Sequence, residues 1–355
     1  MTVQSKQFPC SSCGAFLKFS PTNGNLTCEF CANEDVISPS GEIVEHNYDE
    51  KVSSIKEEEV VTHDTNCAKC GATFEFKPHF FSTNCSYCDT PAVIPMSQDI
   101  KVESLLPFTI DRKGAKKRFK VWVSSRWFAP NAFKKYLNDN KILFGYYIPH
   151  WTYDSDTVTD YNGERGEYYY VTVTKTVTED GKSREVEVEE RRTEWYYVSG
   201  QVRVDFDDIT VVASPTIPNK ILDALEPWDT TKLVPFDDKY ISGFDTQEYT
   251  TNLKDGFSVA KDKMTSKINS AIRNDIGGDE QRINSTDTRY NNTTYKNTLF
   301  PVWSATFKWN KKEYEYAINA QTGEVVGDRP YSIVKIALTV ISIATIIGLI
   351  VYYNR

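Results

Sequence analysis

Eight cysteines near the start of the chain form two sets with identical spacing, and each cysteine of the first set maps onto the second by adding 57. The sets are Cys10, Cys13, Cys28 and Cys31, then Cys67, Cys70, Cys85 and Cys88. Two Cys-x-x-Cys turns placed face to face supply the four thiolates of a tetrahedral metal site, and the short gap between the pairs is typical of zinc. The sequence therefore predicts two four-cysteine zinc ribbons and two Zn²⁺ ions per chain.

Two interpretations of these thiols other than zinc binding are possible. Iron also binds four thiolates, and each set could instead close two disulfides. No amino-terminal signal sequence is recognisable, which favours a reducing compartment and counts against disulfides. Four thiolates leave no open position on a tetrahedral ion, so we expect structural rather than catalytic metal.

An uncharged run, Ile336 to Tyr353, occupies the other end of the chain. With Ile333 and Val334 added it would span about 30 Å as a helix, which matches the apolar thickness of a bilayer. A buried core helix is the alternative, but the run has no amphipathic stripe. We expect a single-pass transmembrane helix over 333–353 that anchors the protein in the cell membrane. Flanking charge does not set its orientation, so the cytosolic placement of the bulk of the chain rests on the thiols and the missing signal.

The intervening sequence predicts an α+β core with an antiparallel sheet. The chain has a net charge of −8, and an acidic stretch separates the two cysteine sets. The expected organisation is zinc ribbon 1 at 5–37, an acidic linker or extended arm at 38–61, zinc ribbon 2 at 62–96, the α+β core domain at 104–328 and the transmembrane helix at 333–353.

Within the core, hydrophobic periodicity and turn signals predict individual elements. The expected helices are one capped by Asp111 and running to Arg126, a short one opened by Pro130, and one from Phe257 to Ile272 ended by Gly277-Gly278. The expected strands are 146–152, a long hairpin over 168–204 that turns at Asp180-Gly181, and three antiparallel strands at 299–307, 313–319 and 324–326.

Other candidate motifs each have a structural interpretation. The basic helix over 112–120 has the charge to contact anionic lipid or nucleic acid, although a solvated face over a packed Phe119 explains it as well. The Gly277-Gly278-Asp279-Glu280 segment resembles a cation or phosphate loop, but a helix end accounts for it. His150 is expected to be a buried core histidine. No phosphate loop, nucleophile elbow or His-Glu-x-x-His motif occurs, so we expect no enzyme activity.

The order of these features resembles a family of bacterial membrane proteins with tandem transcription-factor-IIB-type zinc ribbons, often labelled as relatives of the primosomal replication helicase. Besides the ribbons, the likeness is carried by Leu106-Pro107-Phe108, Arg126-Trp127-Phe128-Ala129-Pro130, Tyr147-Ile148-Pro149, Leu225-Glu226-Pro227-Trp228, Gly277-Gly278-Asp279-Glu280 and Gln321-Thr322-Gly323-Glu324-Val325. A helicase motor needs a phosphate loop that this chain lacks. The resemblance implies only the eight cysteines as zinc ligands, and a link to membrane-stress systems with phage-shock-type or flotillin-like partners.

Two function classes follow. The first is a membrane-tethered adaptor that binds and positions a protein partner at the cytosolic face. The second is a membrane-associated nucleic-acid-binding protein of replication or transcription type, without helicase activity. Each ribbon carries nearly balanced charge and no arginine cluster, and the linker is acidic, so nucleic acid is the less favoured partner.

Overall fold

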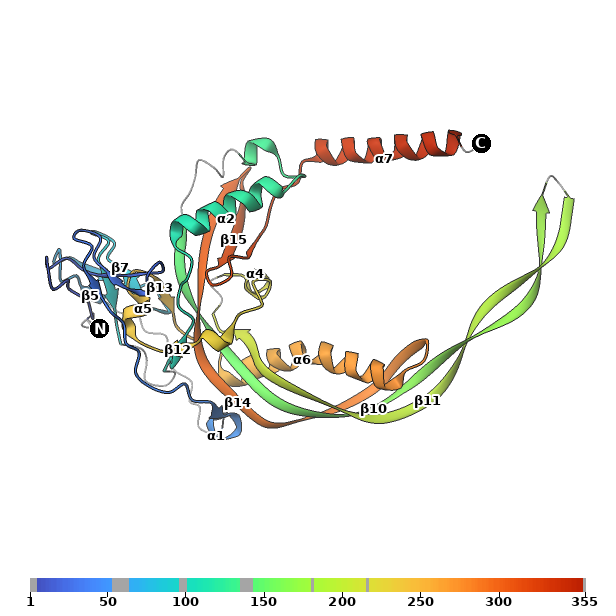
Figure 1. Cartoon of the computed structure of the whole chain (residues 1–355), viewed down its shortest axis with the longest axis horizontal. Helices are drawn as coiled ribbons and strands as arrows, with labels where there is room; N and C mark the ends of the chain where they lie inside the picture. Colours follow the sequence, from blue (N-terminus) through green and yellow to red (C-terminus); the bar gives the residue numbers. More distant parts are fainter. Residues whose placement is uncertain are drawn as a thin grey trace.

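The computed structural model describes residues 5–52, 64–95, 101–134, 143–179, 182–214 and 217–353 (Figure 1). Three long antiparallel strands form its frame: β10 (Phe144–Glu179), β11 (Lys182–Val212) and β14 (Glu280–Trp309). β10 lies in the middle and pairs with β11 on one side and β14 on the other. The predicted α+β architecture is confirmed, and its main sheet is antiparallel apart from two short strands that pair parallel to β10 and β14.

These strands are longer than the sequence indicated. The expected strand at 146–152 and the expected hairpin at 168–204 are parts of one continuous hairpin, β10 and β11. The predicted turn at Asp180-Gly181 lies outside the described residues. The expected strand at 299–307 is only the second half of β14, whose first half pairs with β10 from Glu280 onward. The apolar alternation used to predict strands is absent from that first half, because much of it is exposed to solvent.

Helix α6 (Leu253–Ile276) fills the concave side of this curved sheet (Figure 1). The side chain of Asn252 caps its first turn by accepting from the amide of Asp255 at 2.8 Å. Its buried side chains recur every three to four residues and contact the strands: Leu253, Phe257, Ala260, Met264, Ile268, Ile272 and Ile276. Gly277, at φ +66°, ends the helix in the left-handed conformation that glycine adopts without strain. The predicted helix and its glycine stop are confirmed.

β-Bulges bend the long strands. The register shifts between Tyr153 and Ser155 against β11, and again between Asp154 and Asp156 against β14. Asp208, on β11, has φ +51°, a conformation that non-glycine residues seldom adopt. Bulges increase the local bend and twist of a strand, so the bulges between Tyr153 and Asp156 help the sheet to curve around α6.

Shorter strands widen the sheet around the amino-terminal half of β10. β15 (Lys312–Asn319) and β16 (Val325–Gly327) continue from β14 as the predicted antiparallel strands. Four more short strands join the same sheet: β4 (His46–Asn47), β9 (Ser104–Leu105), β12 (Val234–Pro235) and β13 (Asp245–Gln247). Short helical segments connect them: α1 (Tyr48–Val52), α4 (Asn219–Asp223), η1 (Thr230–Lys232) and α5 (Asp238–Ile241).

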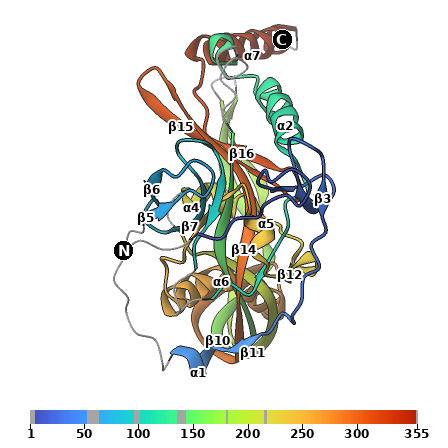
Figure 2. The same ribbon diagram turned by 90° about the vertical axis from the view of Figure 1, so that its left-hand side faces the viewer.

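The two cysteine modules, residues 5–37 and 64–95, pack side by side against this body (Figure 2). The first contains β1 (Lys18–Ser20), β2 (Asn25–Thr27) and β3 (Glu34–Asp35), and the second contains β5 (Asp64–Asn66), β6 (Thr73–Glu75), β7 (Phe80–Asn84) and β8 (Pro91–Val93). β7 pairs with β13, so half of the second module belongs to the main sheet. Phe19 of the first module is 5% exposed and packs on Tyr240 and Phe244.

The segment expected to be an acidic linker is, where described, attached to the body rather than extended. β4 pairs with β14, and Tyr48 of α1 packs its ring 4.5 Å from that of Phe257 on α6. Glu45 forms an ion pair with Lys296 at 3.0 Å. These contacts between residues far apart in the sequence explain why local composition suggested an arm. The acidic cluster Glu57-Glu58-Glu59 lies outside the described residues.

Two helices mark the other end of the body. α2 (Arg112–Ser125) is the predicted basic helix; Asp111 caps it by accepting from the amide of Gly114, and Ala115, Phe119 and Val123 are buried. Residues 131–134 start the second predicted helix after Pro130. α7 (Ile333–Tyr353) has no buried residue and projects from the body (Figure 1). Among the described residues it is the one helix long and apolar enough to cross a membrane.

The far end of the β10–β11 hairpin extends beyond its supports. Gly166 is the last residue of β10 that pairs with β14, opposite Glu280. Residues 167–179 and 182–194 then continue as a two-stranded ribbon, paired only with each other among the described residues (Figure 1).

Candidate metal centres

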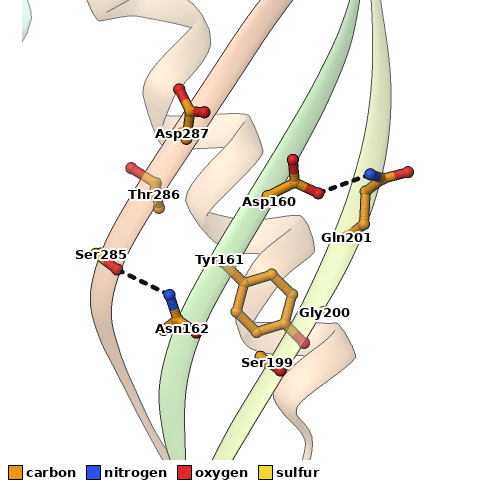
Figure 3. Close-up of a pocket in the computed structure, with 9 residues that line it drawn as sticks. All are labelled: Asp160, Tyr161, Asn162, Ser199, Gly200, Gln201, Ser285, Thr286 and Asp287. Carbon is orange, nitrogen blue, oxygen red and sulfur yellow. Dashed lines mark hydrogen bonds between the residues drawn. The ribbon is translucent and has the colours of Figure 1, made fainter.

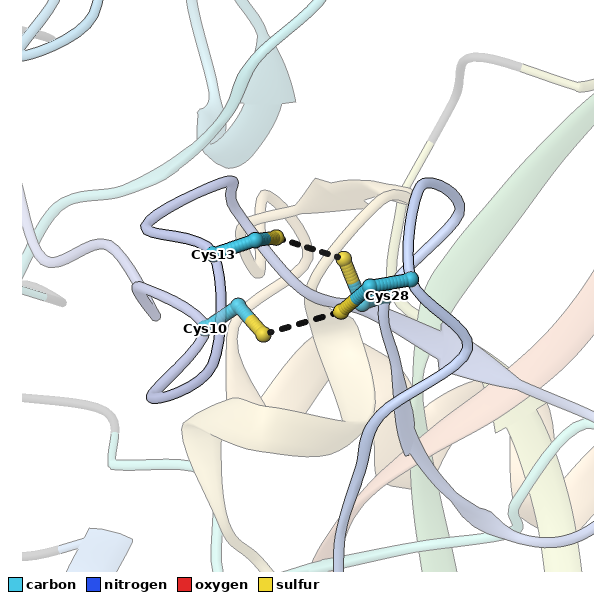
Figure 4. Close-up of side chains that lie close together, drawn as sticks. Cys10, Cys13 and Cys28 are labelled. Carbon is cyan, nitrogen blue, oxygen red and sulfur yellow. Dashed lines mark hydrogen bonds between the residues drawn. The ribbon is translucent and has the colours of Figure 1, made fainter.

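The four cysteines of the first module converge on one point. The sulfur atoms of Cys10 and Cys31 are 3.6 Å apart, and those of Cys13 and Cys28 are 3.5 Å apart. All four ligand atoms lie within 4.8 Å of one another. Figure 4 shows the side chains of Cys10 and Cys13 directed toward Cys28, which lies on the facing turn.

The second module repeats this arrangement. The sulfur atoms of Cys67 and Cys88 are 3.5 Å apart, and those of Cys70 and Cys85 are 3.9 Å apart. This set also fits within 4.8 Å. The predicted grouping of the eight cysteines into two clusters of four is therefore confirmed.

The sulfur spacing fits a metal ion better than disulfides. A disulfide holds its sulfurs about 2.05 Å apart, whereas all eight cysteines here are free thiols. Ligands about 2.3 Å from a tetrahedral zinc ion would be separated by about 3.8 Å, close to the distances in both clusters. Each cluster is thus compatible with one bound metal ion, two per chain.

The backbone builds the same turn four times. After the first cysteine of each pair, the residue four positions later donates its amide to that cysteine's carbonyl at 2.9–3.0 Å; the donors are Gly14, Ala32, Gly71 and Asp89. All four donors have positive φ, between 57° and 73°. Glycine suits this conformation, and alanine and aspartate adopt it in the second turn of each module at some cost. The turn aims backbone amides at the sulfurs.

Those turns favour thiolates at particular positions. The backbone amide of Ser12 is the largest influence on Cys10 and lowers its pKa to about 6, against an opposing effect of burial. The hydroxyl of Thr90 likewise lowers the pKa of Cys88 to about 6. One thiolate in each cluster therefore forms readily near neutral pH. A bound metal cation would favour the thiolate form of the other three cysteines.

The two modules present equivalent aromatic side chains to solvent. Phe30 is 76% exposed and Tyr87 is 72% exposed, and each directly precedes the last cysteine of its module. The ammonium of Lys69, in the second module, lies 5.8 Å from the centre of the Phe30 ring. Lys18 of the first module also joins the two modules through an ion pair of 3.0 Å with Asp89 of the second, and it pairs with Glu29 of its own module at 3.5 Å. The modules therefore form one composite surface with two exposed rings.

This aromatic pair is not among the residues that the sequence motifs predict. The offset of 57 residues that relates the cysteines also relates Phe30 to Tyr87, and that signal could have found them. An exposed aromatic ring beside a metal cluster contributes nothing to the buried core. Because such a ring occurs at the same position in both modules, the pair belongs to the surface of the modules and not to their core.

The other predicted motifs have structural roles. Asp279 accepts from the amide of Tyr168 at 2.7 Å, and Glu280 accepts from its hydroxyl at 2.9 Å, so the carboxylates after Gly277-Gly278 fasten a turn to β10. His150 is 2% exposed, its Nδ1 lies 2.9 Å from the carbonyl oxygen of Ile148, and its ring stacks on Phe300. The interpretation of His150 as a core residue is confirmed.

Two further features resemble ligand sites. The carboxylates of Asp154, Asp207 and Asp208 cluster within 4.8 Å, but Lys296 forms ion pairs with two of them, Asp154 and Asp208. A hollow of about 570 Å³ crosses the three long strands where Asn162 donates to Ser285 and Gln201 donates to Asp160 (Figure 3). It is open to solvent, and its lining also includes Tyr161 and Asp287.

Comparison with known proteins adds one relative. The chain is similar to a protein of Bacillus subtilis (strain 168) described as uncharacterized protein YdjG, with 27% identity over 336 residues, which is 93% of this chain and 92% of that protein. No family model matches the chain. No solved structure matches it either. The likeness to the relative extends over nearly the whole length of both proteins.

Proposed function

We propose that this protein is a membrane-tethered zinc-ribbon adaptor that binds a protein partner through its paired modules and positions it at the cytosolic face of the cell membrane. The zinc assignment is supported by the donor set, because four thiolates at tetrahedral spacing favour zinc and leave no coordination position open. Such ions act structurally, since a module of about thirty residues cannot bury a sufficient core of its own.

The exposed pair Phe30 and Tyr87 carries the proposal. Aromatic side chains are enriched where protein interfaces form, because they bury a large area for little loss of conformational entropy. Here two such rings are held on rigid metal-cluster turns, at 76% and 72% exposure. The sequence resemblance to tandem zinc-ribbon membrane proteins points to phage-shock-type or flotillin-like partners in a membrane-stress response.

Charge favours protein over nucleic acid as the partner. Near the rings, Lys18 is already paired with Glu29 and Asp89, so its charge is offset. Binding to single-stranded nucleic acid uses aromatic rings together with a positively charged groove that follows the phosphates. A nucleic-acid-binding role without helicase activity remains the second candidate, because exposed aromatic rings also stack on bases.

The membrane part of the proposal rests on α7, whose length of 21 residues and apolar composition suit a bilayer. We place the modules and body in the cytosol because eight cysteines that bind metal as thiolates need a reducing compartment, which keeps them from forming disulfides. The proposal assigns no catalytic step to the protein.

The test combines co-purification of the protein's partners with point variants of the exposed rings. The wild-type protein would be solubilised with its membranes in detergent and purified together with its partners. Phe30→Ala/Tyr87→Ala should lose the specific partner while keeping both zinc ions, because the rings are not ligands. The matched control is Tyr170→Ala/Tyr197→Ala, which removes two aromatics of 65% and 87% exposure from β10 and β11. Deleting residues 1–95 is less informative, since it also removes β7 and β8 from the main sheet.

The same variants separate the two candidate functions. Partners retained equally by both double variants would contradict docking through the aromatic pair. Binding of single-stranded DNA with submicromolar affinity and a steep salt dependence, lost in Phe30→Ala/Tyr87→Ala, would favour the nucleic-acid function instead. We expect only weak, salt-sensitive binding to DNA.

A further inference from the structure

The most basic part of this acidic chain lies beside the base of α7. Residues 112–134 contain eight lysines and arginines and no aspartate or glutamate, in a chain whose net charge is −8. They form α2, the loop after it and the start of the next helix, next to the point where α7 leaves the body (Figures 1 and 2).

Specific bonds fasten this segment to α7. The ammonium of Lys335, in the first turn of α7, donates to the carbonyl oxygens of Trp127 at 3.1 Å and Ala129 at 2.9 Å and to the side chain of Asn131 at 2.8 Å. The amide of Ser332 donates to the carbonyl of Phe128 at 2.8 Å. Residues some two hundred positions apart thus meet where the apolar helix begins, so a membrane entered by α7 would lie close to this loop.

Three cations, Lys134, Arg329 and Lys335, lie close enough at the junction to influence one another. Burial is the largest influence on Lys134, and the charges of Lys335 and Arg329 add to it; together they lower the pKa of the Lys134 ammonium. The nearby carboxylate of Asp328, which follows β16, lies within reach of Glu315. Burial is the largest effect that raises the pKa of the Glu315 carboxyl, and the charge of Asp328 raises it further. The described residues record no ion pair for Lys134, Arg329 or Lys335. Mutual repulsion at such a cluster is relieved by an external anion.

An exposed tryptophan accompanies these cations. All seven tryptophans lie in described residues, and Trp127 is the one that is mainly exposed, at 72%. Tyr331 is 60% exposed and carries the guanidinium of Arg329 over its ring at 5.2 Å. Tryptophan and tyrosine are enriched at the headgroup level of membranes, where the ring is buried and its polar group stays hydrated.

We propose that a basic collar, formed by Lys120, Arg126, Lys134 and Arg329 with Trp127 beside them, binds the phosphate headgroups of anionic phospholipids in the leaflet that α7 enters, while Lys335 fastens the collar to α7. This inference rests on the membrane anchoring in the proposed function but not on the identity of the partner. Basic residues close to a membrane each add to its attraction for anionic lipid, and the attraction is screened by salt. The collar would hold the body at a fixed tilt and make its docking sensitive to lipid composition.

The test uses the full chain in lipid nanodiscs and the intrinsic fluorescence of Trp127. Discs of phosphatidylcholine, alone or mixed with phosphatidylglycerol, would carry brominated acyl chains, which quench tryptophans that they contact. We expect quenching in the anionic discs, and loss of most of it in Trp127→Phe, because the other tryptophans are less exposed. Salt should reduce the quenching.

Charge variants test the headgroup contact itself. Titrating short-chain phosphatidylglycerol into phosphatidylcholine discs should show binding that weakens roughly a hundredfold in Lys120→Gln/Lys134→Gln/Arg329→Gln, since each basic residue contributes about fivefold. The matched control, Lys220→Gln/Lys254→Gln/Lys267→Gln, removes three exposed lysines of α4 and α6 and should bind as the wild type does. Zinc content of every variant would be measured as a check of folding.

The outcomes separate the two proposals. If the protein stays in the discs and Trp127 is not quenched, or if both triple variants bind phosphatidylglycerol like the wild type, the collar is refuted and the anchor stands. If the protein fails to enter discs at all, both the anchor and the collar are wrong. Binding of inorganic phosphate as strong as that of phosphatidylglycerol would show an anion site unrelated to the membrane.

Discussion

The ammonium of Lys296, on β14, lies 2.6 Å from a carboxylate oxygen of Asp208 on β11, with β10 between the two strands. The same ammonium contacts Glu45 at 3.0 Å and Asp154 at 3.7 Å, and the Lys296 side chain is only 8% exposed. Burial alone would lower the pKa of Lys296, but hydrogen bonds to Asp208 and Glu45 outweigh it and raise that pKa. One cation therefore joins the bulged strands to the segment before α1.

Replacing this cation should destabilise the body. Lys296→Met leaves the carboxylates of Asp154 and Asp208 close together without a counterion, which should lower the free energy of unfolding by about 3 kcal/mol. Urea unfolding followed by tryptophan fluorescence measures the change. The control is Lys308→Met, whose ion pair with Glu313 is 77% and 62% exposed and should contribute under about 1 kcal/mol. Equal effects of the two substitutions would contradict the network.

Stability should fall with acidification because of His150. Burial, partly offset by the bond to Ile148, lowers its pKa from 6.5 to about 3. Between these values the unfolded chain binds the proton and the folded chain does not, so stability is complete above pH 6.5 and is lost as pH falls. From pH 7 to pH 5 the loss should be about 2 kcal/mol. His150→Gln should remove that part of the slope in urea titrations, while any loss of metal from the cysteines persists in both proteins.

Metal analysis should give about two zinc equivalents per chain and little iron, following the preference of closed four-thiolate sites. Cys28→Ser should lose the first ion and retain the second, because the two clusters share no ligand. Proton-induced X-ray emission on purified protein counts both metals. A metal-free protein with disulfide-bonded modules would refute the assignment. Because Phe19 packs on Tyr240 and Phe244, loss of the first ion should also loosen the body near α5.

Ending the chain at Arg329 should release it from membranes, because α7 is removed. The fragment keeps Lys120, Arg126 and Lys134, so a portion should remain bound at low salt and dissociate at high salt. Sedimentation of membranes before and after a salt wash, followed by carbonate extraction, measures this. Full-length protein should resist both treatments. A fragment that also resists carbonate would show that α7 is not the sole anchor.

The sequence was sufficient for features that depend on local pattern. The eight cysteines, the stripe from Leu253 to Ile276 and the apolar run of α7 each follow from spacing or periodicity, and each is found in the structure. In all three cases neighbours within one segment provide the evidence. That the metal is zinc and that α7 crosses a membrane are still predictions.

Long-range contacts explain what the sequence did not indicate. The first half of β14 is rich in Asn, Thr and Arg and has no apolar alternation, yet it is a strand because β10 supplies its hydrogen-bonding partners. The modules were expected on an extended arm, but Phe19 meets Tyr240 only when the chain has folded. Such pairings are encoded jointly by distant segments, so local composition does not reveal them.

The position of β14 in the chain has a consequence for folding. Gly166 and its partner Glu280 are joined through β11 and α6, which must be synthesised before the third strand can reach β10. Until then the hairpin has a bare hydrogen-bonding edge, the kind of surface on which chains associate wrongly. High contact order slows folding, so we expect the docking of β14 to limit its rate. Expression at low temperature, or with a chaperone that shields strand edges, should therefore raise the yield more than added zinc does.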